Sequence, residues 1–329
     1  MSEQQAGGAE GKTLLPSKGA LCVAITPCLQ RTLLFSSFTL GAVNRAHRVI
    51  LSPGGKAVNA ARALTALGGQ CQLLGFCGAH TGQQFRSLLH RCHLGAELVA
   101  MAQPTRICTT LVDDQQGTVT ELVEEAPRPT THEWQAFEAK LQVLLPGYEL
   151  AIAAGALPPG LAQGTYGRIA KRAAQHRTAL LLDASGSALR QALCHAPLLV
   201  KLNHLELAIT LGRSLETTTE RVDAARRLAQ DGARWVLVTQ AAGTALLISQ
   251  TEAWQFYPPP VRTVNPVGSG DATTAGIAFA LLRGQSMIEA VRLGIACGSA
   301  NATTVTAGEI TARLSHQLAE QVEQRRHEP

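Results

Sequence analysis

Residues 265–284 join a glycine-rich turn directly to an apolar helical pattern, in the sequence NPVGSGDATTAGIAFALLRG. Gly268 and Gly270 permit backbone conformations that a side chain would forbid. At the start of the predicted helix, the free N–H groups of Ser269, Gly270, Asp271 and Ala272 would point at an anion. The turn therefore predicts a phosphate-binding site with one carboxylate, Asp271, beside it.

Asp271 has two interpretations that do not exclude each other. As an N-cap, it would accept a hydrogen bond from a backbone N–H and favour the helix dipole. As a general base, it would take the proton of an attacking hydroxyl group while the preceding amides neutralise charge on a transferring phosphoryl group. The sequence contains neither a GxxxxGKS/T motif nor a GxGxxG motif. The stretch SPGGKAVN at 52–59 has a glycine pair and a lysine, but it lacks the spacing of GxxxxGKS/T and the Ser or Thr that follows the lysine there. The P-loop and dinucleotide-binding classes are therefore excluded.

A second glycine pair, in PGGKAVNAARALTALGG at 53–69, precedes a helical pattern that begins near Lys56. Gly54 and Gly55 would allow close backbone contact with sugar hydroxyls. Lys56 and Asn59 would lie one turn apart at that end of the helix. A plain turn with a solvated lysine explains the segment equally well by itself. Its pairing with the later glycine turn favours a substrate-binding role.

In LLVKLNHLELAITLG at 198–212, Asn203 and Glu206 stand three residues apart between a predicted strand and a predicted helix. This spacing suits an N-terminal capping box. It also suits a Mg²⁺ ion that rides on nucleotide phosphates, because such an ion needs one or two protein ligands, often through water. Both interpretations stay open. The stretch VTQAAGTALL at 238–247 is a small-residue turn after a strand, where a nucleotide could rest.

Short apolar runs alternate with longer helical patterns along the chain. The predicted strands are residues 20–26, 71–76, 149–155, 179–183, 198–202, 235–239 and 245–249. Because most of these runs are apolar without alternation, they are typical of parallel strands covered by helices on both faces. Such sheets bind ligands beyond the carboxyl ends of their strands. Residues 29–52 and 105–126 contain alternating segments, which predict half-exposed antiparallel strands that form a small flap over the site.

The bulk composition indicates a folded globular protein. Hydrophobic residues make up 46% and charged residues 16% of the chain, and no run approaches the roughly 18 apolar residues of a membrane span. The first eighteen residues are polar and glycine-rich, so we expect a loose tail, one large domain over residues 19–329 and a cytoplasmic location. The formal charge of +5 is spread along the chain, which disfavours nucleic-acid binding. The cysteines form no CxxC pair, which favours buried thiols over disulfides or zinc.

The order and content of these motifs resemble the ribokinase-like, or PfkB, carbohydrate kinases over about residues 20–315. GGK…N comes early, a strand followed by Asn-x-x-Glu lies in the middle, and GSGD comes near the end. NPVGSGDAT and VKLNHLEL are similar to the branch that contains tagatose-6-phosphate kinases and 1-phosphofructokinases. The resemblance implies a three-layer α/β/α sandwich with a mostly parallel central sheet. It also implies a small β lid, which often mediates dimers.

The resemblance implies a role for each matching residue. Asp271 would be the catalytic base, and the anion hole would consist of Gly268, Ser269 and Gly270. Asn203 and Glu206 would organise magnesium. The sugar would contact Gly54, Gly55, Lys56 and Asn59, with Arg106 near a substrate phosphate. ATP would lie near Lys201, Asn203, Thr239, Gly243 and Asn301.

Three departures from the family pattern lie on the sugar side. Gln30 stands where the branch has an aspartate that grips sugar hydroxyls; its amide can hydrogen-bond a hydroxyl but carries no charge. Ala57 replaces the glycine usual after Lys56, and AGALPPG at 154–160 lacks the usual serine. The motifs for phosphoryl transfer keep the family pattern.

These observations favour a kinase of a ketohexose phosphate that uses ATP and Mg²⁺, first of all a tagatose-6-phosphate kinase that makes tagatose 1,6-bisphosphate. A 1-phosphofructokinase is the nearest alternative. Gln30 and the altered pocket also suit a kinase of an unphosphorylated sugar or nucleoside. A sugar-phosphate-binding regulator without turnover is disfavoured, because the base and the magnesium residues are all present. We expect a small-molecule substrate, no nucleic-acid or membrane partner, and a homodimer formed through the lid.

Overall fold

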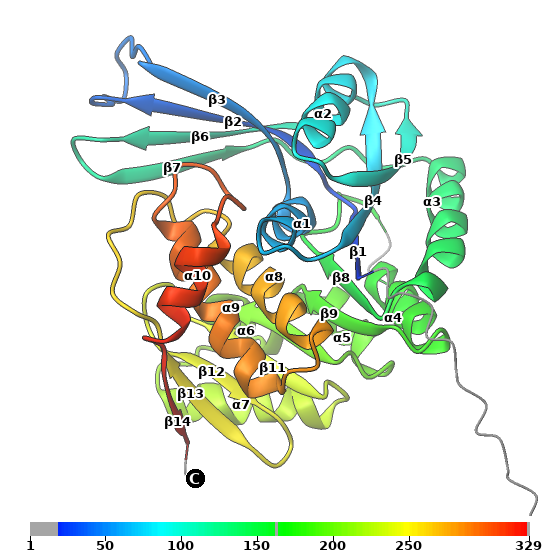
Figure 1. Ribbon diagram of the computed structural model, residues 1–329. Helices are drawn as coiled ribbons and strands as arrows, with labels where there is room; N and C mark the ends of the chain where they lie inside the picture. Colours follow the sequence, from blue (N-terminus) through cyan, green and yellow to red (C-terminus); the bar gives the residue numbers. More distant parts are fainter. Residues whose placement is uncertain (1–18, 162–163, 328–329) are drawn as a thin grey trace, which may run out of the picture.

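A computed structural model describes residues 19–161 and 164–327 of the chain (Figure 1). The predicted tail at residues 1–18 lies outside the described residues. A ten-stranded sheet has the strand order β14-β13-β12-β11-β10-β9-β8-β1-β4-β5. Its strands are β1 (Ala20–Ala24), β4 (Cys71–Gly78), β5 (Gly95–Met101), β8 (Leu150–Ala154), β9 (Ala179–Asp183), β10 (Leu199–Asn203), β11 (Trp235–Thr239), β12 (Ala245–Ile248), β13 (Ala253–Tyr257) and β14 (Glu323–Arg326).

The large sheet is parallel from β5 to β11 and antiparallel from β11 to β14. Every predicted run forms one of its strands, so the mostly parallel sheet is confirmed. In β1, the Leu21 and Val23 side chains belong to one hydrophobic core and Cys22 to the other. Both faces of this strand are covered, which is why its sequence is apolar without alternation.

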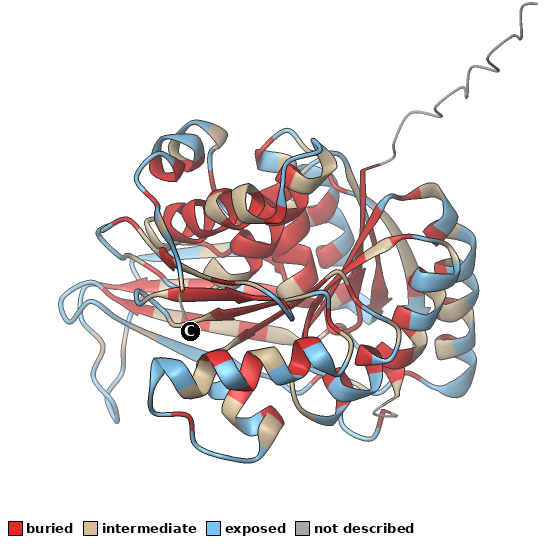
Figure 2. Ribbon diagram, turned by 90° about the horizontal axis from the view of Figure 1, so that it is seen from below, coloured by how far each residue is buried: buried red, intermediate tan, exposed pale blue. Residues whose placement is uncertain are grey.

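Helices cover both faces of the large sheet, so the fold is a three-layer sandwich (Figure 2). None of the described helices is long and apolar enough to cross a lipid bilayer. One face packs against α1 (Lys56–Ala66), α2 (Ala79–Arg91), α8 (Ser269–Leu282), α9 (Met287–Ala302) and α10 (Ala312–Ala319). The other packs against α3 (Thr131–Leu144), the 3-10 turn Leu145–Gly147, α4 (Thr165–Gln175), α5 (Gly186–Leu193), α6 (His204–Leu211) and α7 (Thr218–Gln230).

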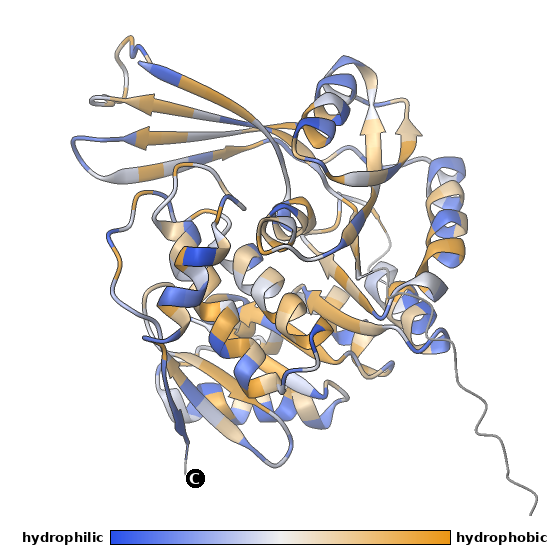
Figure 3. Cartoon of the chain, viewed as in Figure 1, coloured by the Kyte–Doolittle hydropathy of each residue, from blue (hydrophilic) through white to orange (hydrophobic). Residues whose placement is uncertain are grey.

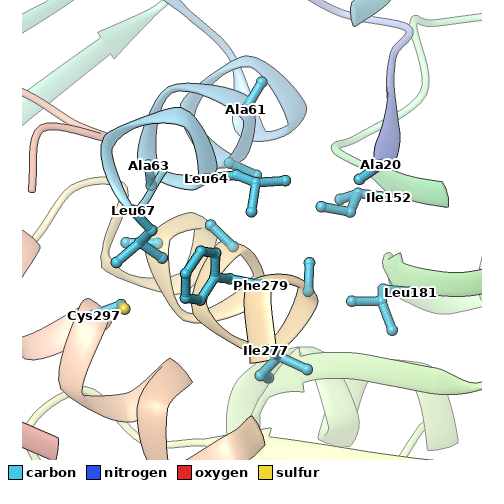
Figure 4. Close-up of a cluster of buried hydrophobic side chains, with 14 of the residues drawn as sticks. Ala20, Ala61, Ala63, Leu64, Leu67, Ile152, Leu181, Ile277, Phe279 and Cys297 are labelled. Atoms are coloured by element: carbon cyan, nitrogen blue, oxygen red, sulfur yellow. The ribbon is translucent and has the colours of Figure 1, made fainter. Parts of the chain in front are cut away.

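Helix α8 is apolar all round because it is surrounded by the protein interior. Every residue from 271 to 280 is buried, and the helix appears mostly orange or pale in the hydropathy view (Figure 3). Phe279 lies in a cluster with Leu64 of α1 and Leu181 of β9 (Figure 4). Burying such a side chain stabilises the fold by about 1.5–3 kcal/mol. The packing therefore fixes α8 and, with it, the glycine turn at its start.

A separate four-stranded sheet projects from the large one (Figure 1). Its order is β3-β2-β6-β7, from β2 (Cys28–Phe35), β3 (Arg48–Gly54), β6 (Ile107–Asp113) and β7 (Thr118–Val123). The antiparallel prediction holds within each hairpin but is wrong for the central pair, because β2 and β6 are parallel. Each follows a parallel strand of the large sheet, β1 or β5, so both hairpins leave that sheet in the same sense.

The eight cysteines are all free thiols. Cys194 is exposed, so the prediction of buried thiols is wrong for it; it lies just after α5, where the helix reaches solvent.

Candidate active site

The candidate site lies at the carboxyl edge of the parallel strands, where α1 and α8 begin. Gly55 and Gly268 are the N-cap residues of these two helices. Asp183 and Asn203 are the last residues of β9 and β10. Ligands of open parallel sheets bind at this edge, and the two predicted glycine motifs meet there although more than 200 residues separate them in sequence.

Asp271 lies in the first turn of α8 but is not its cap. Gly268 occupies the N-cap position and no side chain caps the helix, so the N-cap interpretation of Asp271 is wrong. Its carboxylate instead accepts a 2.8 Å hydrogen bond from Nδ2 of Asn59 on α1. The side chain has its oxygen atoms at the junction of α1 and α8, with the residue only 7% exposed. The carboxylate is therefore held in one orientation.

The surroundings of Asp271 raise the pKa of its carboxyl group to near neutral. Burial raises the pKa of its carboxyl group to about 7, and the negative charge of Asp183 adds to this effect. The hydrogen bond from Asn59 and the charges of Lys56 and Lys201 act in the opposite direction. A carboxylate with a pKa near the working pH is suited to accept a proton and release it again.

The turn before Asp271 is fixed by close packing. Gly268 has φ of +82°, and a β-carbon on it would lie 2.5 Å from Cβ of Ala307. Asn301 is fully buried; its Nδ2 donates to Val267 O at 2.9 Å and to Ser269 Oγ at 3.2 Å, and its Oδ1 accepts from Gly308 N at 2.7 Å. Ser269 N donates to Pro266 O at 3.1 Å and Ala272 N to Gly268 O at 2.9 Å, so the prediction of free N–H groups is wrong for these two residues. The N–H groups of Gly270 and Asp271 are the ones that could bind an anion at this helix start.

Asp183 completes the site, and sequence reasoning missed it. Its Oδ1 accepts from Lys56 Nζ at 2.8 Å, and its Oδ2 pairs with Lys201 Nζ. Burial alone would raise the pKa of Asp183, but the charges of Lys201 and Lys56 outweigh burial and lower it to about 2. The signal available was a carboxylate at the carboxyl end of an apolar strand, a position where ligands of parallel sheets bind.

Lys56 and Lys201 both extend into the site. The Lys56 ammonium lies 3.4 Å from Oε1 of Glu206 as well as bonding Asp183. Burial opposes the charge of Lys56, but Asp183 and Glu206 raise its pKa above the usual value, so it stays protonated. A β-carbon on Gly270 would lie 3.0 Å from Lys201 Nζ, which places this second ammonium group against the glycine turn.

Asn203 and Glu206 form the predicted capping box of α6. Asn203 Oδ1 accepts from Glu206 N at 2.9 Å, and Glu206 Oε2 accepts from Asn203 N at 2.8 Å. Across the described residues, no three acidic, histidine or cysteine side chains gather to hold a metal. The donor set nevertheless fits an ion bound mainly to phosphates and water, because the Glu206 carboxylate is 25% exposed at the edge of the site.

On the predicted sugar side, the backbone of Gly54 and Gly55 packs closely against residues before and within β2. Gly55 has φ of +103°, and a β-carbon on it would lie 2.9 Å from the carbonyl oxygen of Thr26. Gln30 is buried, and its Nε2 donates to Thr110 Oγ1 at 2.8 Å. A β-carbon on Gly54 would lie 2.9 Å from Cβ of Gln30, so the two residues are neighbours.

Arg106 lies next to this side of the site. Its Nη2 donates to Thr26 O at 3.0 Å and its Nη1 to Glu124 O at 2.9 Å. Its buried Nε has no hydrogen-bond partner in the described part of the chain. Arg106 also lines a cavity of about 250 Å³ together with Thr81 and Glu124. An anion in this cavity would lie next to the positive charge of the Arg106 guanidinium group.

The residues predicted near the nucleotide do not all meet. Thr239 ends β11 directly opposite Asn203 of β10, so it lies on the same edge of the sheet. Gly243 lies in the turn between β11 and β12, where its N–H donates to Gln240 O. Asn301 has no exposed surface, and its amide group bonds the glycine turn. Asn301 therefore holds the glycine turn in place and has no exposed surface that a nucleotide could contact.

A buried carboxylate with a raised pKa, the start of a helix and two ammonium groups lie together, and such an arrangement could support phosphoryl transfer. Comparison with known proteins agrees. A family model described as the pfkB family carbohydrate kinases matches residues 20–312. The chain is 31% identical over 300 residues to a 1-phosphofructokinase of Bacillus subtilis, covering 91% of this chain and 97% of the relative. It is 27% identical over 306 residues to a tagatose-6-phosphate kinase of Staphylococcus epidermidis, covering 92% and 98%.

Among solved structures, the tetrameric inhibited form of phosphofructokinase-2 from Escherichia coli superposes with a TM-score of 0.84 at 24% identity, covering 92% of this chain and 98% of that one. At this identity the likeness supports the fold alone. The family match and the relatives decide the class: the chain belongs to the pfkB family of carbohydrate kinases. It is an ATP-dependent sugar kinase.

Proposed function

We propose that this kinase phosphorylates a hydroxyl group of a ketohexose phosphate, with Asp271 as the general base. The observation that carries the proposal is the Asp271 carboxylate, held by Asn59 with a pKa of about 7 at the start of an anion-binding helix. The hydroxyl oxygen attacks the terminal phosphorus of ATP, and the bond from that phosphorus to the bridging oxygen of ADP breaks. Asp271 takes the hydroxyl proton.

The other residues of the site have distinct parts in this proposal. The N–H groups of Gly270 and Asp271 and the ammonium group of Lys201 would face the oxygens of the transferring phosphoryl group. Magnesium bound to the nucleotide phosphates would be held through water by Glu206 and Asn203, and it would supply positive charge there. Thr239 and Gly243 lie on the nucleotide side of the same sheet edge.

The acceptor side supports a substrate that already carries a phosphate. The guanidinium group of Arg106 places a positive charge beside a cavity, and its Nη2 bonds the same Thr26 carbonyl that packs against Gly55. The proposal assigns the substrate phosphate to Arg106 and the reacting hydroxyl group to Asp271. Gly54, Gly55, Lys56 and Asn59 would then contact the sugar between the two ends, and Gln30 would face it from β2.

Two ketohexose phosphates satisfy this arrangement. Tagatose 6-phosphate is favoured by the NPVGSGDAT motif, whereas fructose 1-phosphate is favoured by the higher identity to the relative named 1-phosphofructokinase. In the first case the product is tagatose 1,6-bisphosphate, and in the second it is fructose 1,6-bisphosphate. The proposal includes the four-stranded sheet as a lid over the acceptor side that also joins two copies of the chain.

A panel assay tests the proposal. ATP consumption by the full chain is measured with Mg²⁺ and tagatose 6-phosphate, fructose 1-phosphate, fructose 6-phosphate, free hexoses or nucleosides. We expect the highest kcat/KM with one of the first two sugars. Faster turnover of a free hexose or nucleoside than of every phosphosugar would overturn the proposed substrate class, and Gln30 would then be the first residue to re-examine.

A further inference from the structure

Asp183 joins two lysines that come from different elements of the site. Lys56 begins α1, whereas Lys201 lies inside β10 and is the register partner of Asp183 on β9. The Asp183 side chain is only 2% exposed, and each of its oxygens is taken by one ammonium group. Because both oxygens are occupied, this carboxylate is poorly placed to accept a substrate proton or bind a ligand directly.

Lys201 depends on Asp183 for its place in the site. Its side chain is only 6% exposed, and the ion pair with Asp183 is the one salt bridge that it makes within residues 19–161 and 164–327. A buried ammonium group without a partner carries a large desolvation cost, so the side chain would turn away from the site. With Asp183 present, Lys201 Nζ is held next to Gly270 of the anion turn.

We infer that Asp183 is the positioning residue of this kinase, which holds Lys201 against the turn that receives the transferring phosphoryl group and Lys56 at the acceptor side. The inference rests on the proposed roles of Asp271 and the turn. Asp183 touches neither the hydroxyl group nor the phosphoryl group in this scheme. It acts through the two lysines and through its own charge.

The charge of Asp183 has a second, measurable effect. The charged groups that act on Asp271 are Lys56 from α1, Asp183 from β9 and Lys201 from β10. Asp183 raises the pKa of Asp271, and the two lysines lower it. Removing the Asp183 charge therefore lowers the pKa of the base directly, and Lys56, which keeps Glu206 as a partner, continues to lower it. The acidic limb of the pH profile should move to lower pH.

The test compares Asp183→Asn, Lys201→Met and the double variant in the full chain, with whichever sugar the wild type phosphorylates. We expect kcat to fall about tenfold to a hundredfold in Asp183→Asn, the size of loss that misplaced groups cause. The acidic limb of kcat/KM should shift to lower pH. If Asp183 acts through Lys201, the double variant should be little worse than the single ones.

Glu133→Gln is the matched control, because Glu133 is also a buried carboxylate that accepts two hydrogen bonds, from Ala102 N and Thr130 N, but lies outside the site. It should lower the melting temperature and leave the pH limb in place. The inference is overturned if Asp183→Asn behaves like this control, or if its loss in kcat simply multiplies with that of Lys201→Met. Turnover by the wild type reports on the proposed substrate separately, so the two can fail independently.

Discussion

A carboxylate in the first turn of a helix ordinarily stays ionised, because the helix dipole and the free N–H groups favour negative charge. At Asp271 burial and the nearby charge of Asp183 outweigh that effect and raise its pKa to about 7. The residue can therefore accept a proton from the acceptor hydroxyl in one step and release it in the next. Asn59 donates its hydrogen bond to Oδ2 of Asp271, so Oδ1 of Asp271 can face the substrate.

This pKa predicts the pH dependence of the reaction. Because the base must be deprotonated to act, kcat/KM should rise with pH through about 7 and level off above it. Asp271→Asn should lower kcat by about a hundredfold or more, since an amide cannot accept the proton. Steady-state kinetics between pH 5 and 9 measure both, with KM for ATP as the control. A variant with near-normal kcat would remove Asp271 from the mechanism.

Arg106 gives a second prediction at this scale. Arg106→Ala should raise KM for the phosphosugar about tenfold or more, the size of a lost charge-assisted hydrogen bond, and leave KM for ATP nearly unchanged. Arg172→Ala is the control, because Arg172 is a half-buried surface arginine on α4 bonded to Gln142. Equal KM values for Arg106→Ala and the wild type would indicate that the substrate phosphate binds elsewhere.

The site residues that follow glycine turns could be identified from the sequence. Asp183 could not, because it enters the site through the pairing of two strands. Asp271, Lys56 and Asn59 follow glycine turns, whose backbone demands are visible locally. Asp183 follows no motif, and its partner Lys201 becomes its neighbour only because β9 and β10 pair with those two residues in register. The N-cap interpretation failed for a related reason: the left-handed conformation of Gly268 starts α8 three residues before Asp271.

At the scale of elements, the start of α8 is the part on which the site depends. The helix is buried from residue 271 to residue 280, so it cannot shift to accommodate a change in the turn before it. Gly268 is confined by its positive φ and by the backbone of Ala307, whose Cα would lie 2.9 Å from an added β-carbon. A change at Gly268 must therefore move the N–H groups that face the phosphoryl group.

Gly268→Ala should lower kcat/KM for ATP by about a hundredfold, comparable to losing a donor of an anion hole. Gly284→Ala is the matched control: Gly284 follows α8 with φ of +77°, and an added β-carbon would meet nothing within 4 Å. It carries the same backbone strain of about 1–2 kcal/mol without the clash. Thermal melts and kinetics of both variants separate strain from misalignment. Similar kinetics for the two would show that the packing against Ala307 is unimportant.

Strand prediction succeeded where apolar runs were continuous and failed where other signals were needed. The parallel strands from β1 to β11 carry such runs because helices cover both of their faces. β14 has the sequence EQRR at the edge of the sheet, so no apolar pattern marks it. The parallel pairing of β2 with β6 joins segments about 80 residues apart, and alternation within each segment gives no information about it.

At the scale of the whole molecule, the outer face of the four-stranded sheet has no cover among the described residues. The register places Leu51, Arg31, Thr109 and Leu122 in one row across all four strands. Leu51 is 47% and Leu122 55% exposed, and Val49 in the next row is 51% exposed. An apolar face of this kind in a protein with a well-packed core usually marks an interface. A second copy of the chain would cover this face and restrict the movement of the four-stranded sheet in each copy.

Leu51→Glu should therefore convert an oligomer into monomers, because it places a negative charge at the β3 end of the exposed row, where the partner copy would exclude water. Light scattering coupled to gel filtration measures the mass. Val143→Glu is the control, since Val143 is also an exposed apolar residue (78%) but lies on α3, outside this sheet. A wild type that is monomeric at every concentration would contradict the interface. The substituted face lies on the four-stranded sheet and not at the nucleotide edge of the site. If the variant is monomeric, and its KM for the sugar rises while its KM for ATP is unchanged, the partner copy also orders this sheet over the acceptor side.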